Sequence, residues 1–140
     1  MICASEKGHL NVVKALLERG ANVDHSDKDG WTTLIWASTM GHLDVVKALY
    51  ENRALLDHQN KDVDAALTCA SGEGHLDIVK ALLERGANVD HPNMYELIAL
   101  KSTIFWGHLD IVKALLEKGA NVDLIPVLIE NGANVNAQYK

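Results

Sequence analysis

The sequence predicts an all-α fold, an α-solenoid of stacked helix-turn-helix units with β-hairpin-like fingers between them. The first observation behind this prediction is a period of 33 residues, because the string GHL occurs at Gly8, Gly41, Gly74 and Gly107. The second is that a nearly constant half-unit alternates with a variable one. A two-helix unit this short cannot bury its own apolar stripe, so neighbouring units must stack around one continuous core.

The constant half of each unit predicts a short amphipathic helix. The segment GHLNVVKALLERGANVDH (8–25) returns as GHLDIVKALLERGANVDH (74–91) and as GHLDIVKALLEKGANVD (107–123), and residues 41–58 are a looser copy. Apolar residues recur at helical spacing in these segments and leave one face polar. An aspartate early in the helix, such as Asp44, suits the positive end of the helix dipole.

Glycine marks the end of this helix in three of the four copies. Gly20, Gly86 and Gly119 follow the last apolar turn, where a left-handed residue ends a helix with least strain. Arg53 stands at the same position in the looser copy. A left-handed helix end there would cost an arginine roughly 1 kcal/mol.

The variable half predicts a finger that folds back into a second short helix. A polar turn such as residues 26–30 contains the Asp and Gly residues that favour chain reversal. We expect a helix to follow from Thr33 to Met40, with Thr32 as its N-cap.

The whole chain, residues 1–140, is expected to form a single array. The expected units are 1–25 (partial), 26–58, 59–91, 92–123 and a truncated capping unit at 124–140. In the last of these, VLIENGANVNA (127–137) repeats the end of a constant half, and Pro126 could open a short capping helix. The alternative is that the sequence is a fragment, or that the reading frame has lost a piece.

This pattern resembles the ankyrin-repeat family. The resemblance rests on the 33-residue period, the block GHLDIVKALLERGANVD and the segment DKDGWTTL (27–34), and it covers nearly the whole chain. It implies paired antiparallel helices with fingers projecting from them. It also implies a concave face built from the fingers and the first helix of each unit.

Two departures from the family pattern carry structural expectations. The helix opening Thr-Pro-Leu-His is degraded, for example to TTLI at 32–35. In the family that histidine bonds finger backbone, so its absence predicts fingers loosened by about 1 kcal/mol for each missing bond. Thr103 and Ile104 replace small residues where first helices pack closely, so the fourth unit is expected to be splayed or locally repacked.

Composition argues against several classes of protein. The net charge is −6, with 13 Lys and Arg against 19 Asp and Glu, whereas nucleic-acid and anionic membrane surfaces recruit basic faces. No apolar run approaches the roughly 20 residues of a membrane span, and the opening MICASEKGHL lacks a secretory core. We therefore expect an intracellular protein, cytoplasmic and monomeric, that binds neither nucleic acid nor membrane.

Histidine and cysteine recur in repeat register and do not predict a chemical site. Stacked helices lie roughly 8–10 Å apart, too far for one histidine series to share an ion. Cys3 and Cys69 are two units apart, which predicts two reduced, partly buried thiols. We expect no metal, no cofactor and no enzymatic activity. The competing hypothesis is a metal-dependent protein or an enzyme that uses the recurring histidines or cysteines.

Five of the seven aromatic residues lie in the variable halves, where the scaffold does not need them. Aromatic side chains anchor protein interfaces, although some of these could simply pack between units. Mapping finger tips and first helices residue by residue gives these expected partner-binding positions: Lys28, Asp29, Trp31, Trp36, Met40, Asp62, Asp64, Tyr95, Phe105 and Trp106.

The predicted function is a protein–protein interaction module of the adaptor, scaffold or inhibitor type. Its partner would be another protein, held on the concave face of fingers and first helices. Acidic residues beside apolar ones on this face suit a partner with a basic spot next to an apolar ridge. The alternative is an architectural fragment of a larger ankyrin-repeat protein whose activity lies elsewhere.

Overall fold

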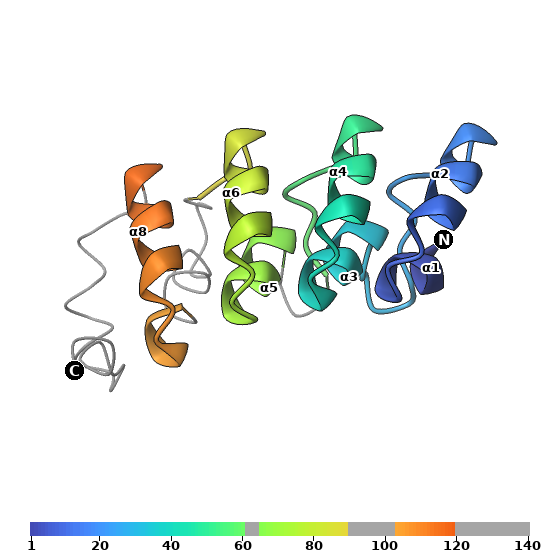
Figure 1. Ribbon diagram of the computed structural model, residues 1–140. Helices are drawn as coiled ribbons and strands as arrows, with labels where there is room; N and C mark the ends of the chain where they lie inside the picture. The colour runs from blue at the N-terminus through green and yellow to red at the C-terminus, as the bar shows by residue number, and fades with distance from the viewer. Residues whose placement is uncertain (61–64, 90–102, 120–140) are drawn as a thin grey trace.

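The computed structural model describes residues 1–60, 65–89 and 103–119, and these segments form a row of stacked helical hairpins (Figure 1). One row of helices contains α2, α4, α6 and α8, and the other contains α1, α3 and α5. Their bounds are α1 (Ile2–Glu6), α2 (Leu10–Glu18), α3 (Thr33–Met40), α4 (Leu43–Glu51), α5 (Ala66–Gly72), α6 (Leu76–Glu84) and α8 (Leu109–Glu117). This architecture confirms the predicted all-α solenoid.

The first helix of the second unit begins and ends where the sequence predicts. Thr32 is the N-cap of α3, and its hydroxyl accepts a hydrogen bond from the Ile35 amide at 3.2 Å. Gly41 ends the helix in the left-handed conformation. Its neighbour α4 has Asp44 in its first turn, where the carboxylate accepts from the Val45 amide at 2.8 Å.

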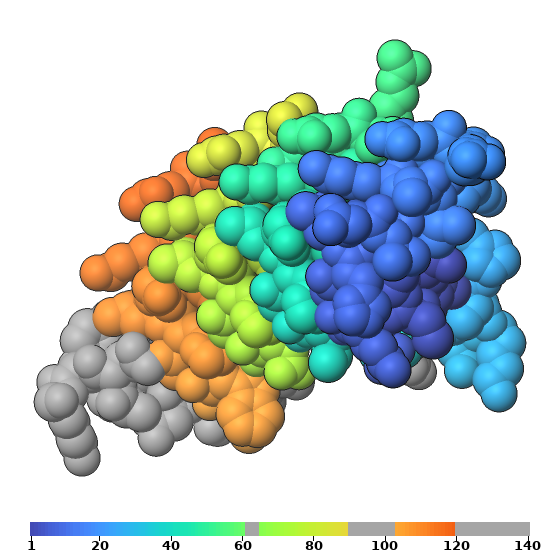
Figure 2. All heavy atoms as spheres, turned by 45° about the vertical axis from the view of Figure 1, so that its right-hand side comes forward, coloured from blue at the N-terminus to red at the C-terminus, as the bar shows by residue number. Residues whose placement is uncertain are grey.

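Stacking, rather than folding within a unit, buries the apolar stripe. Val45, Ile78 and Ile111 occupy equivalent positions on α4, α6 and α8, and all three are 0% exposed. Val12 holds the same position on α2, in the first described unit, and it is 49% exposed. Figure 2 shows the units as successive colour bands, each lying against the next.

Histidines of the GHL strings join one unit to the next. His42 Nε2 lies 2.9 Å from the carbonyl oxygen of Glu6, and His75 Nε2 lies 3.0 Å from that of Thr39. Each ring also lies over a glycine of the preceding unit. A Cβ at Gly41 would come within 2.8 Å of the His75 ring, so only glycine leaves room for it. These histidines are structural.

The fingers are tied to each other and to the helices. The Asp24 carboxylate accepts from the Leu55 amide of the next finger at 2.8 Å, and Asp57 accepts from Asn88 in the same way. Ile35, at the position of the family histidine, is buried. Because the Thr33 hydroxyl donates to the Val23 carbonyl oxygen at 2.7 Å, this finger keeps a side-chain bond to the helix that follows it.

The described part of the fourth unit packs against the third unit. Thr103 and Ile104 are both buried, and α8 packs against α6. The two large side chains are therefore accommodated inside the stack.

Left-handed backbone occurs at the predicted helix ends. Gly20, Gly86 and Gly119 have φ of 82°, 89° and 95°. Arg53 has φ of 65° and is the single non-glycine residue with positive φ in the described part of the chain. The strain predicted at Arg53 is therefore present.

The contact between histidine and glycine can be tested with two matched glycines. Gly41→Ala and Gly86→Ala both place an alanine at positive φ, which costs about 1–2 kcal/mol. At Gly86 nothing lies within 4 Å of the added Cβ, whereas at Gly41 it meets the His75 ring. We expect Gly41→Ala to lower the free energy of unfolding by a further 1–3 kcal/mol or so in urea titrations. Equal losses would show that the contact is not tight.

Relief of strain at Arg53 should stabilise the array. We expect Arg53→Gly to raise the free energy of unfolding by about 1 kcal/mol, because glycine adopts positive φ without a steric cost. Urea titration of the two proteins measures this. An unchanged or lower midpoint would contradict the prediction.

Candidate functional site

Two tryptophans from different elements meet beside the finger of the second unit. Trp31 precedes α3 and Trp36 lies within it, and their ring centroids are 4.6 Å apart with the planes tilted by 34°. Both side chains are partly exposed. The finger segment, light blue in Figure 2, stands at the edge of the array. The structure thus brings together two of the residues expected to bind a partner.

Asp27 organises both tryptophans. One of its carboxylate oxygens, Oδ1, accepts from the Asp29 and Trp31 amides, each at 3.0 Å. The other, Oδ2, accepts from the indole Nε1 of Trp36 at 3.3 Å. A bridge between Ser26 and Thr32 closes the turn, as the polar sequence predicted. The sequence identified Asp27 as a turn residue, but nothing in it showed that this carboxylate reaches α3.

The hydrogen bonds keep Asp27 ionised. Desolvation acts to raise the pKa of this carboxyl, but donation from the Trp31 and Asp29 amides and the Trp36 indole, with the charge of Lys28, outweighs it. The pKa of Asp27 is therefore lowered. An anion is thus fixed at the edge of the Trp36 ring.

Two of the other expected partner-binding residues lie on the turn beside this pair, and the rest lie apart from it or outside the described residues. Lys28 and Asp29 are exposed on the turn, and Met40 is exposed at the end of α3. In the fourth unit Phe105 and Trp106 form an edge-to-face pair with centroids 5.0 Å apart, and α5 lies between their unit and α3. The expected positions outside the described residues are Asp62, Asp64 and Tyr95.

Phe105 and Trp106 are 59% and 65% exposed. The pair therefore does not pack between units, because side chains buried in the stack are almost fully inaccessible to solvent. The pair is available on the surface.

The described residues contain little that points to metal or thiol chemistry. Over residues 1–60, 65–89 and 103–119, no three His, Cys, Asp or Glu side chains gather to hold a metal ion. Both cysteines are free thiols, and Cys3 is exposed, not partly buried as predicted, while Cys69 is partly buried. In the same segments every helix is too short or too polar to cross a bilayer.

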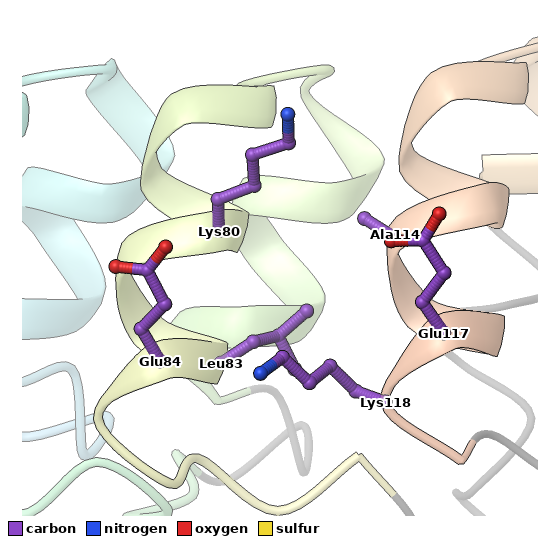
Figure 3. Close-up of a pocket in the computed structure, with 6 residues that line it drawn as sticks. All are labelled: Lys80, Leu83, Glu84, Ala114, Glu117 and Lys118. Atoms are coloured by element: carbon purple, nitrogen blue, oxygen red, sulfur yellow. The ribbon is translucent and has the colours of Figure 1, made fainter.

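A groove of about 230 Å³ lies between α6 and α8, away from the tryptophans (Figure 3). Lys118 reaches across it from α8 toward Leu83 on α6. At the equivalent positions of α4 and α6, the Arg85 guanidinium lies 4.5 Å from the centroid of the Tyr50 ring. Leu83, which lines the groove, stands in register with Tyr50. Its lining is Lys80, Leu83, Glu84, Ala114, Glu117 and Lys118.

Ionised Asp27 should contribute to stability in a defined pH range. Its pKa is lower in the folded state than the ordinary value of 3.8, so the folded state favours the charged form. The contribution is complete above the unfolded pKa and is lost as the pH falls through the folded pKa. We expect wild type to be more stable than Asp27→Asn at pH 6, and this difference to shrink at pH 3. A difference in unfolding free energy that does not change with pH would contradict this.

The stacked hairpins and their connecting fingers agree with comparisons against known protein families. A family model described as ankyrin repeats (3 copies) matches residues 1–62 and also residues 52–126. A search of curated proteins finds no match to the chain. Because the two family matches together extend over residues 1–126 of the 140, the chain belongs to the ankyrin-repeat family.

Proposed function

We propose that this chain binds a partner protein through the face formed by its fingers and first helices, with the Trp31–Trp36 pair as the central anchor. Ankyrin repeats are generally protein–protein interaction modules and typically lack catalysis. The partner class therefore follows from the family. The choice of face rests on the geometry of the tryptophan pair.

The single observation that carries this proposal is that two large rings lie against each other in a partly exposed position, one of them hydrogen-bonded to Asp27. Their centroids are 4.6 Å apart, and the Asp27 carboxylate fixes the Trp36 indole. Tryptophans are enriched among the residues that dominate binding energy. Rings that are already ordered lose little side-chain entropy when a partner covers them.

Exposed apolar side chains in the first helices of the second and fourth units support this face. Phe105 and Trp106 follow Ile104 in the first helical segment of the fourth unit, and Trp106 is in register with Met40 at the end of α3. All three side chains are exposed. We propose that they extend the binding surface along the array, together with Lys28, Asp29, Asp62, Asp64 and Tyr95, which the sequence also predicts as partner-binding.

The test compares partner capture by the intact chain and by Trp31→Ala/Trp36→Ala. We expect a protein retained by the wild type, identified by mass spectrometry, to bind the double variant at least 30-fold more weakly, since each anchor contributes about 1–2 kcal/mol or more. Far-UV circular dichroism should be unchanged, because the stacking core lies elsewhere.

The matched control is Val12→Ala, which trims an exposed apolar side chain on α2, outside the proposed face. It should retain the same protein as the wild type. If the double tryptophan variant is folded and binds the partner as tightly as the wild type, the proposed face is wrong.

A further inference from the structure

We propose that the Trp31–Trp36 pair and Asp27 together bind an arginine side chain of the partner protein. This inference rests on the proposed function and adds the chemistry that the partner presents to this site. The cluster combines aromatic faces and a carboxylate, both of which attract a planar cation.

The hydrogen-bond inventory of Asp27 leaves room for one more donor. A carboxylate offers about four acceptor positions. Three are used, by the Asp29 and Trp31 amides on Oδ1 and by the Trp36 indole on Oδ2. The remaining capacity is on Oδ2, the oxygen that lies at the edge of the Trp36 ring. A cation above that ring could therefore donate to the same carboxylate.

The hydrogen bond from the Trp36 indole N–H to Asp27 also strengthens the attraction of this ring for a cation. The Trp36 N–H donates to an anion, which pushes electron density into the indole. A cation is attracted to the face of an aromatic ring by its quadrupole, and tryptophan is the best of the three aromatic residues. The anion and the ring face therefore favour the same ligand charge.

A guanidinium suits this arrangement better than an ammonium. The guanidinium is planar, stacks on an aromatic face and carries five N–H donors in a fixed plane, whereas an ammonium is a compact and strongly hydrated point charge. The chain itself contains such a contact, because Arg85 lies over the ring of Tyr50 at 4.5 Å. The same geometry at Trp36 would leave guanidinium donors at the ring edge, facing Asp27.

Among the described residues, the charges around the cluster fit a cationic ligand, with Lys28 as a local competitor. The chain carries a net charge of −6, which favours the approach of a basic segment. Asp29 lies two residues from Asp27 in the same turn. Lys28 interacts electrostatically with Asp27, so a bound arginine must compete with Lys28 for the charge of this carboxylate.

The test uses the full chain and two small probes of nearly the same shape, one cationic and one neutral. Nα-acetyl-arginine amide is titrated into ¹⁵N-labelled protein while the indole N–H resonance of Trp36 is followed. Nα-acetyl-citrulline amide is the neutral probe of nearly the same shape. We expect a saturable shift of the Trp36 resonance with arginine and an affinity at least fivefold lower with citrulline. The indole N–H resonance of Trp106, which is 65% exposed, is the internal reference for shifts that do not depend on the proposed site.

Asp27→Asn tests the carboxylate directly. The amide oxygen can still accept from the turn amides, so the finger should keep its conformation. We expect arginine affinity to fall at least fivefold. Asp44→Asn removes the same charge from α4 and should leave the affinity within twofold of wild type. If Asp27→Asn alters the circular dichroism spectrum, the citrulline comparison on the wild type decides.

Three outcomes would overturn the arginine site: equal affinity for the two probes, no Trp36 response, or equal losses in the two aspartate variants. None of them would count against the proposed function. If partner capture depends on Trp31 and Trp36 but arginine is not bound, the face stands and the ligand chemistry is wrong. If arginine binds but partner capture does not depend on the pair, the proposed function fails.

Discussion

Adjacent units are held in register where an imidazole lies over a glycine and meets a carbonyl oxygen near the end of the first helix of the preceding unit. His42 and His75 make this contact with Glu6 and Thr39. The glycine beneath each ring has positive φ, so it ends the first helix and also leaves room for the ring. The contact fixes how far neighbouring units can approach. The apolar positions on the second helices are buried only because the units lie at this distance.

A fixed stack frees the variable halves for recognition. The apolar core of the helices and the histidine contacts do not involve the exposed side chains of the fingers. Side chains of the variable half can therefore be large and partly exposed without loss of the core. The second unit shows how such freedom is used: Asp27 orders its turn and anchors Trp36, which lies against Trp31. The cluster is bonded to the turn and to α3 at the same time, and preorganisation of this kind lowers the entropic cost of binding.

Departures from the repeat consensus have local structural consequences, and the described units still stack despite them. Arg53 adopts the backbone conformation that glycine adopts in the other copies, at a cost in strain. Tyr50 and Arg85 form a contact between units where Leu83 and Lys118 leave a groove. Thr103 and Ile104 are buried inside the stack. A solenoid tolerates such changes because each unit contacts only its neighbours.

The sequence by itself determined the period, the helices, their caps and the stacking, because those features depend on spacing that repeats along the chain. It predicted the bounds of α3, the capping by Thr32 and the strained end at Arg53. It also singled out Trp31 and Trp36, since aromatic residues stood where the scaffold did not require them. Only the tertiary structure decided that these two rings meet and that Asp27 holds one of them. That contact joins a turn to a helix nine residues later, and its geometry depends on how the finger folds back. The Tyr50–Arg85 contact likewise joins two units, and no pattern within one unit could reveal it.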